Sequence, residues 1–329
     1  MRWEAVTVRS LALRALLLAV LFAAVALLLG RIVPGAGARL RNADAGWLVL
    51  GVGCEVMACG GYAALFHAVF ARRPAPISGR RSMQIALAEL GGFAVVPAGL
   101  GGPAARVWGL RRAGMSWRTL GVRTVTHAPI FNAPYVGAAL VLGLAAVVGA
   151  GPGRASLTLA LAPAGVVLAA LSAFALVTLA GRLRWLDRES GWRRTAREVL
   201  AVVPDGIRET PAVVRDPRAV AGSVAFWAGD CAVLWAAFNA VGVVPPVGVI
   251  VLAYMLGQLG NALPLPGGVG GVEPVMLSVL AASGVDSGAG AAAIVCYRAI
   301  SLGVQAALGA IAFATLAPEI GAPQGPTSS

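Results

Sequence analysis

Long apolar runs separated by short polar segments dominate this chain. A helix of about 20 residues rises about 30 Å, which matches the hydrocarbon thickness of a bilayer. The apolar residues form continuous runs rather than the alternating faces that are typical of half-buried strands. This pattern predicts an all-α integral membrane protein. Six membrane-spanning helices are expected at residues 11–30, 46–70, 124–150, 156–180, 219–243 and 288–316.

Two further apolar stretches, 82–113 and 247–283, are interrupted in the middle by Pro and Gly. The interruptions read PAGLGG at 97–102 and PLPGGVGG at 264–271. A helix does not continue through such sequences, and non-helical backbone at membrane depth is stable only where protein or water satisfies it. We therefore expect two re-entrant hairpins of short half-helices, packed inside the bundle of spans.

The two interrupted stretches are copies of one another. Residues 87–102 align with residues 256–271 without a gap, and seven of the 16 positions are identical. Pro and Gly provide five of these matches, so the similarity is more than shared apolar character. Hairpins that enter from opposite faces form an inverted-topology repeat, as in many secondary transporters that bind substrate near the midplane.

Composition and charge agree with membrane insertion. The chain is 58% hydrophobic and 12% charged, whereas soluble domains carry about 25% charged residues. All 26 basic residues are Arg, and apart from Arg298, which is intramembrane, they lie in the segments between the spans or near the span ends rather than on one nucleic-acid-binding face. With the N-terminus in the cytoplasm, 21 Arg are cytoplasmic and four are outside, as the positive-inside rule requires. We expect a multi-pass protein of the cytoplasmic membrane with both termini cytoplasmic and no nucleic-acid partner.

The domain organisation follows from the same pattern. We expect one membrane domain over 1–318 and a disordered tail at 319–329. The repeat halves are about 46–150 and 219–317. The basic segment 181–218 between them is too short for a catalytic domain and predicts an amphipathic surface helix.

The cysteines and histidines predict no metal site. Cys54, Cys59, Cys231 and Cys296 all lie in apolar runs, and the first two are not at a zinc-ribbon spacing. We expect them to pack as small apolar residues. The sequence has two His and no G-x-x-x-x-G-K-[ST] motif, so neither a metal nor a nucleotide cofactor is expected.

The second interruption, with Glu273 and then Arg298, resembles the second signature of the flippase-like family, which includes the transmembrane region of lysylphosphatidylglycerol synthases. The first, with Arg106 and Gly114, resembles its companion signature. The resemblance covers about residues 10–317 and implies a multi-span protein that translocates aminoacylated phospholipids or handles polyprenyl-linked intermediates. The sequence has no counterpart of the synthases' soluble aminoacyl-transferase domain, so we do not expect lipid synthesis.

The glycines of the interruptions are candidates for substrate binding. Backbone N–H groups at half-helix N-termini bind phosphate well, although small residues are equally typical of close helix packing. Arg106 either holds a phosphate from the cytoplasmic side or is one more positive-inside Arg. The glycine candidates are Gly99, Gly101, Gly102, Gly267, Gly268, Gly270 and Gly271.

Charged residues inside the apolar runs are costly and are expected to face a cavity or a partner. Glu273 and Arg298 are predicted to form an intramembrane ion pair that either binds the head group or is purely structural. Four more polar residues either line a cavity and couple transport to protons, or pair across the bundle. These are Glu55, Glu89, Asp230 and Gln258, of which Glu89 aligns with Gln258 in the repeat.

These features together predict translocation of an anionic phospholipid or polyprenyl-phosphate-linked substrate, bound near the midplane between the repeats, without enzymatic activity. One alternative is a membrane-embedded transferase, which would need a cluster of acids or a nucleophile–base pair that the sequence does not display. Another is an accessory protein for lipid-linked envelope precursors, which would not need the intramembrane charges.

Overall fold

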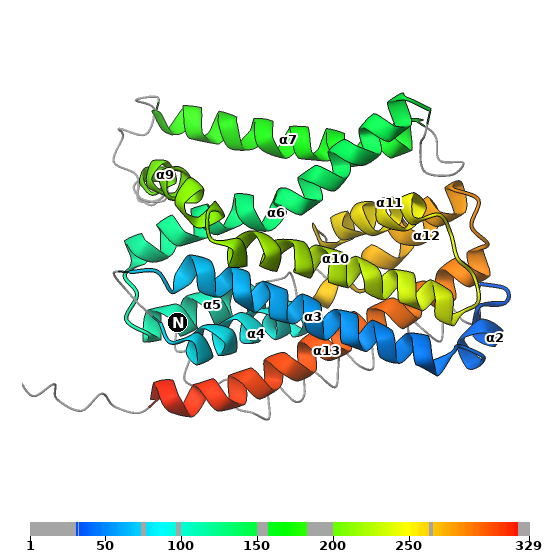
Figure 1. Ribbon diagram of the computed structural model, residues 1–329, viewed down its shortest axis with the longest axis horizontal. Helices are drawn as coiled ribbons and strands as arrows, with labels where there is room; N and C mark the ends of the chain where they lie inside the picture. Colours follow the sequence, from blue (N-terminus) through cyan, green and yellow to red (C-terminus); the bar gives the residue numbers. More distant parts are fainter. Residues whose placement is uncertain are drawn as a thin grey trace, which may run out of the picture.

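A computed structural model describes residue 31 and residues 33–73, 77–96, 100–149, 157–182, 200–262 and 266–321. All regular elements in these ranges are helices, as the predicted all-α class requires (Figure 1). The predicted span at 11–30, Gly99 and most of the predicted tail lie outside the described residues.

Four helices of the described part are long and apolar enough to cross a membrane, and they coincide with four predicted spans. The fourth predicted span coincides with a further helix, α7 (Leu157–Arg182). Helix α6 begins earlier than expected because the Ser116 hydroxyl accepts a hydrogen bond from the Thr119 N–H at 3.1 Å and caps it. The four helices that are long and apolar enough to cross a membrane are α3 (Ala45–Phe70), α6 (Trp117–Val147), α10 (Pro217–Ala240) and α13 (Ser287–Gly321).

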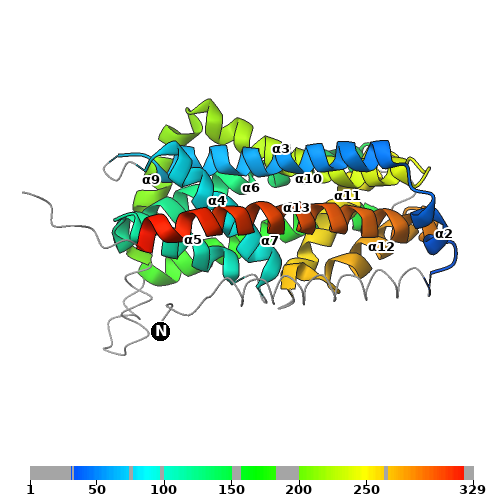
Figure 2. The same cartoon turned by 90° about the horizontal axis from the view of Figure 1, so that it is seen from below.

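Each predicted interruption lies between two short helices. The first separates α4 (Gly79–Val95) from α5 (Gly101–Arg112). The second separates α11 (Val247–Gln258) from α12 (Val272–Ala282); the 3₁₀ turn η3 (Leu259–Ala262) directly follows α11, and η4 (Pro266–Gly268) lies within the interruption. The α4–α5 pair lies toward the end of the molecule that carries α9 (Val203–Val214), and the α11–α12 pair toward the end that carries α2 (Ala36–Arg41) (Figures 1 and 2).

The two helix pairs meet in the middle of the molecule. A Cβ atom placed on Gly267, between α11 and α12, would lie 2.9 Å from the carbonyl oxygen of Ala94 at the end of α4. Ala94 also forms a small buried apolar cluster with Val269 and with Leu302 of α13. The two predicted interruptions are therefore neighbours in space, and both pack on α13.

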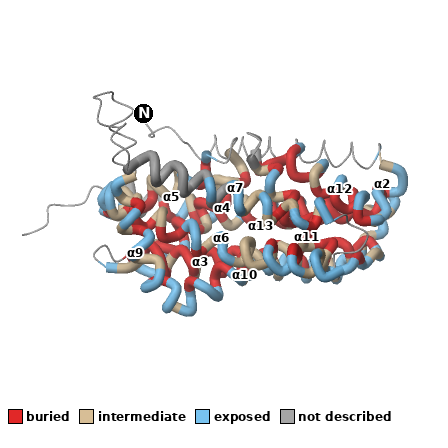
Figure 3. The backbone as a smooth tube through the Cα atoms, turned by 90° about the horizontal axis from the view of Figure 1, so that it is seen from above, coloured by how far each residue is buried: buried red, intermediate tan, exposed pale blue. Residues whose placement is uncertain are grey.

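The outer surface is apolar, unlike that of a soluble protein, although the core is apolar as well. Large apolar side chains face outward, for example Val49 and Leu144 at 71% and 66% exposure. Carboxylate and guanidinium groups are buried, for example those of Glu55, Glu273 and Arg298. Buried backbone positions follow α3, α11 and α12 through the middle of the molecule (Figure 3). Charged groups inside an apolar exterior are what a bilayer imposes on a polytopic protein. The chain is thus built as a multi-pass membrane protein.

Glycines bring α3 and α10 into backbone contact. A Cβ atom on Gly61 would lie 2.7 Å from the Gly222 carbonyl oxygen, and one on Gly222 would lie 2.5 Å from the Gly61 carbonyl oxygen. Small residues permit such close approach in membranes, where dispersion contacts replace the hydrophobic effect between helices. The contact places Glu55 of α3 close enough to Asp230 of α10 for their carboxyl groups to interact electrostatically.

Gly101 and Gly102 have the same role between α5 and α4. A Cβ atom on Gly101 would lie 2.2 Å from the Gly92 carbonyl oxygen, and one on Gly102 would lie 3.0 Å from the Glu89 carbonyl oxygen. Both glycines are buried, and α4 covers the face that a bulky ligand would need to approach. Close helix packing therefore accounts for glycine at both positions, and their role in substrate binding stays a prediction.

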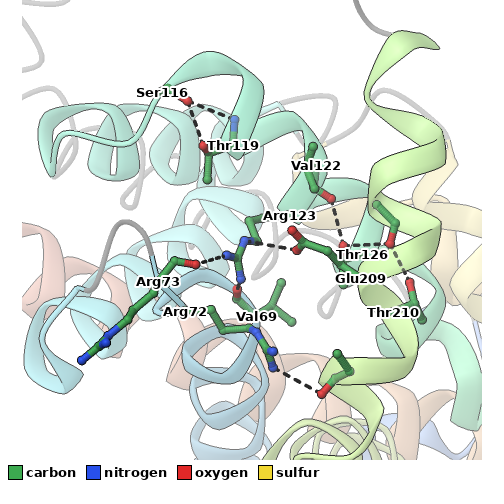
Figure 4. A network of polar contacts seen from close by, with 12 residues as sticks. Val69, Arg72, Arg73, Ser116, Thr119, Val122, Arg123, Thr126, Glu209 and Thr210 are labelled. Carbon is green, nitrogen blue, oxygen red and sulfur yellow. Dashed lines mark hydrogen bonds and ion pairs between the residues drawn. The ribbon is translucent and has the colours of Figure 1, made fainter.

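Arg123 of α6 fastens the surface helix α9 to the bundle (Figure 4). Its Nη1 donates to the Val69 carbonyl oxygen and its Nη2 to the Arg73 carbonyl oxygen, both at 2.9 Å. Its Nε lies 3.5 Å from a carboxylate oxygen of Glu209 on α9. One buried guanidinium therefore joins the end of α3, the start of α6 and the helix found within the basic segment 181–218.

Replacing Gly101 by Ala should destabilise the protein, because the added methyl group cannot fit between α5 and α4. Overpacking of this kind costs about 1–3 kcal/mol. Thermal unfolding in detergent will measure the loss as a lower melting temperature. Gly60→Ala is the matched control, since nothing lies within 4 Å of its added Cβ. Equal melting temperatures for the two variants would contradict close packing at Gly101.

Arg123→Ala should release α9 from the bundle, because it removes two donors to buried carbonyl groups and the partner of Glu209. Limited proteolysis in detergent should then cut residues 200–216 faster than in the parent protein. Arg118→Ala serves as control, because the Arg118 side chain, which pairs with Asp205, is 75% exposed. Exposed ion pairs contribute about 1 kcal/mol or less to stability. Identical cleavage of both variants would show that Arg123 does not hold α9.

Candidate functional site

The ion pair predicted from the sequence is present at the centre of the second helix pair. The Arg298 Nε of α13 donates to the Glu273 Oε1 of α12 at 2.9 Å, and both side chains are 4% exposed. The Arg298 Nη2 also donates to the carbonyl oxygen of Gly267. The guanidinium thus holds the glycine-rich turn and the first turn of α12 against α13.

The glycine-rich turn has internal partners for its polar groups. Gly267, Gly268 and Gly270 have φ of 56°, 68° and 88°, which is the left-handed region that favours glycine. The Gly270 N–H donates to the Glu273 Oε2 at 2.7 Å, and the Gly271 N–H donates to the Gly268 carbonyl oxygen at 3.0 Å. The Glu273 carboxylate therefore occupies the N-terminus of α12, the kind of position where helices bind anions.

The first helix pair has its own ion pair, which the sequence did not assign. Arg106 of α5 lies 3.4 Å from the Glu89 Oε1 of α4, with side chains 13% and 10% exposed. The Arg106 guanidinium also lies over the Phe70 ring, 5.8 Å from its centroid. Arg106 is therefore held inside the bundle by Glu89, rather than standing free as one more positive-inside Arg.

Asp230 of α10 is surrounded by hydroxyl groups. The Tyr254 hydroxyl donates to its Oδ2 at 2.7 Å and the Tyr297 hydroxyl at 3.1 Å. The Ser301 hydroxyl donates to its Oδ1 at 3.0 Å. Both carboxylate oxygens are thus hydrogen-bonded although the residue is buried, which is the condition for keeping a charge inside a protein.

Glu55 of α3 lies at the other end of this network. Its Oε1 accepts from the Gln305 Nε2 at 2.8 Å and, at 3.9 Å, from the Cys59 Sγ. The Gln305 Nε2 is also 3.3 Å from the Ser301 Oγ, which links Glu55 to the hydroxyl groups around Asp230. The Glu55 Oε2 is buried and has no hydrogen-bond partner among the described residues.

Gln258 of α11 extends the network toward the second interruption. Its Nε2 donates to the Tyr297 hydroxyl oxygen at 3.3 Å, and its Oε1 accepts from the Asn261 Nδ2 at 2.7 Å. Sequence reasoning named Gln258 but missed its partners. A usable signal was present on α13, where Tyr297, Ser301 and Gln305 recur every four residues and so share one face.

An apolar cavity of ≈ 450 Å³ adjoins this network between α6, α10 and α11. Aromatic and aliphatic side chains line it, including Tyr135, Trp227 and Trp235. Tyr254 belongs to its wall and carries the hydroxyl that donates to Asp230. Val224 and Val247 belong to its lining and are 47% and 67% exposed, so the cavity opens onto the apolar outer surface.

The central polar groups bind one another. No group of three or more His, Cys, Asp or Glu side chains is placed to hold a metal ion in the part of the chain that the structure describes. The four cysteines are free thiols. What the arrangement offers chemically is a buried cation, a helix N-terminus and hydroxyl-bound carboxylates, beside an apolar cavity.

Comparison with known families places these features in context. The family model described as the lysylphosphatidylglycerol synthase TM region matches residues 12–309. A comparison with curated proteins finds no match. The matched segment includes both interruptions, both central ion pairs, three of the four long apolar helices and most of α13. The chain therefore belongs to the lysylphosphatidylglycerol synthase transmembrane-region family.

Proposed function

We propose that the protein translocates an anionic lipid, or a lipid-linked anionic head group, across the cytoplasmic membrane. The observation that carries the proposal is the position of the Glu273 carboxylate. It lies between the Arg298 guanidinium and the Gly270 N–H, at the N-terminus of α12. A head-group phosphate presents the same charge and acceptor atoms, and can replace the carboxylate at both donors.

Such replacement gives the substrate a direct influence on conformation. Without substrate, Arg298 joins α12 and the Gly267 turn to α13. A phosphate bound to Arg298 releases Glu273, so the contact between α12 and α13 weakens. A ligand shifts an equilibrium only if it interacts differently with the two states, and competition with Glu273 supplies that difference.

The apolar cavity offers a binding site for the acyl or prenyl tail of the lipid. It lies between α6, α10 and α11, and its wall includes Tyr254 of the central network. An acyl or prenyl chain entering from the bilayer would remain in apolar surroundings while its head group reaches the charged centre. The anionic lipid is the proposed partner, and transport rather than catalysis is the proposed activity, because the central charged groups are arranged to bind.

We also propose that α4–α5 and α11–α12 are re-entrant hairpins that enter from opposite faces, with both chain termini cytoplasmic. The two pairs approach the centre from opposite ends of the molecule (Figure 2). The Arg-rich segments adjoin α4, α5 and α9, at one of these ends. The positive-inside rule assigns that end to the cytoplasm.

Reconstituted liposomes test the proposal through the Glu273–Arg298 pair. The parent protein should move fluorescent phosphatidylglycerol between leaflets, as followed by quenching of the outer leaflet. Glu273→Gln should lower the rate at least tenfold, because Arg298 then has no competing anion to exchange. Arg298→Gln should lower yield as well, since an unpaired buried carboxylate costs about 3–5 kcal/mol.

The double variant Glu273→Gln/Arg298→Gln separates structure from transport. It leaves no charge unpaired, so yield should recover while transport stays low. Asp286→Asn is the control, because the Asp286 side chain, which pairs with Arg39, is 61% exposed. Normal transport by the double variant would make the pair purely structural, and absence of transport by the parent protein, with any anionic lipid tested, would overturn the proposed function.

A further inference from the structure

The buried carboxyl groups outnumber the cations that neutralise them. Arg106 is paired with Glu89 and Arg298 with Glu273. Arg123 is engaged near the α9 end with Glu209 and two carbonyl groups. Glu55 and Asp230 remain, and every hydrogen-bond donor that the structure gives them is uncharged. Within the part of the chain that the structure describes, two adjacent carboxyl groups thus lie in the interior without a cation bound to either.

The two carboxyl groups have unequal surroundings. Asp230 accepts three hydroxyl hydrogen bonds shared between both oxygens, and such donors stabilise the ionised form. Glu55 is fully buried, and its Oε2 has no partner in the described part of the chain. Two ionised carboxylates side by side repel strongly where water is excluded. A single proton on the Glu55 Oε2 removes this repulsion and leaves Asp230 charged.

We propose that Glu55, together with Asp230, is a proton-binding site that couples lipid translocation to the proton gradient. The inference rests on the proposed transport function and adds its source of energy. A proton binds at the Glu55 Oε2 from one side of the membrane and leaves from the same atom toward the other. No covalent bond between heavy atoms changes, and no oxidant or reductant takes part.

Helix α13 links this proton site to the head-group site. Arg298 lies next to Tyr297 and one turn before Ser301. Tyr297 and Ser301 both donate to Asp230. When a phosphate takes Arg298 from Glu273, any rotation or shift of α13 also moves the hydroxyl groups that stabilise the Asp230 charge. Both sites therefore contact the same helix, α13, through which binding at one site can affect the other.

Two other titratable groups on helices near α3 contact residues other than Glu55. Glu89 of α4 is bound to Arg106, and His127 of α6 is stacked among aromatic rings. On α3 itself, Cys54 and Cys59 flank Glu55. The titratable groups of the packed elements that interact with Glu55 are Asp230 of α10 and Tyr297 of α13.

Infrared difference spectroscopy of the purified protein detects the proton without any transport assay. At neutral pH the parent protein should show the carbonyl band of a protonated carboxylic acid. Glu55→Gln should remove this band, Glu55→Asp should shift it, and the surface control Asp286→Asn should leave it unchanged. A spectrum that keeps the same band in Glu55→Gln and Glu55→Asp would overturn the assignment of the proton to Glu55.

Transport in the same liposomes then tests coupling. With the membrane potential clamped, a gradient of one pH unit supplies about a tenfold driving force per proton, and the parent protein should accumulate lipid in one leaflet up to that ratio. Glu55→Gln should show no gradient-driven accumulation. Transport by the parent protein that ignores the pH gradient, or follows a sodium gradient instead, would overturn the coupling while the proposed function stands. Absence of any transport would overturn the function itself.

Discussion

Exclusion of water from the bilayer interior is the constraint on which this structure depends. A charge at membrane depth persists only if a partner replaces water, and interrupted helices persist only if other groups satisfy the freed backbone. Arg298 meets both requirements at once, because it pairs with Glu273 and also donates to the Gly267 carbonyl oxygen. Arg298 therefore stabilises the non-helical backbone of the second interruption and also provides a positive charge in the middle of the molecule.

Helix α13 is the element on which the central contacts converge. It provides Arg298 to the second helix pair, Leu302 to the cluster between the two pairs, and Gln305 to Glu55. Glycine contacts bring the surrounding helices near enough for these links to form. Gly91 of α4 and Gly309 of α13, for example, approach so closely that a Cβ on Gly91 would lie 2.7 Å from the Gly309 Cα. The polar network on α13 therefore depends on the tight backbone packing of the helices around it.

Much of the architecture could be predicted because apolar length and Pro/Gly interruptions act locally. The four long helices, the two breaks and the Glu273–Arg298 pair all follow from such signals. The partner of Arg106 could not be predicted, because Glu89 reaches it only through the crossing of α4 and α5. The packing role of Gly101 depends on the same crossing. The hydroxyl groups around Asp230 come from α11 and α13, so the residue's environment exists only after the helices assemble.

The central claim is that two helix pairs enter the membrane from opposite faces and meet at the charged centre. The most direct measurement is labelling of single cysteines with a membrane-impermeant reagent in intact cells and inverted vesicles, after the four native cysteines are replaced by Ala. One cysteine replaces Ala113, which directly follows the C-terminal end of α5, and the other replaces Ala282, the last residue of α12. The account predicts that position 282 reacts only in intact cells and position 113 only in inverted vesicles. Reaction of both positions from the same face would contradict it.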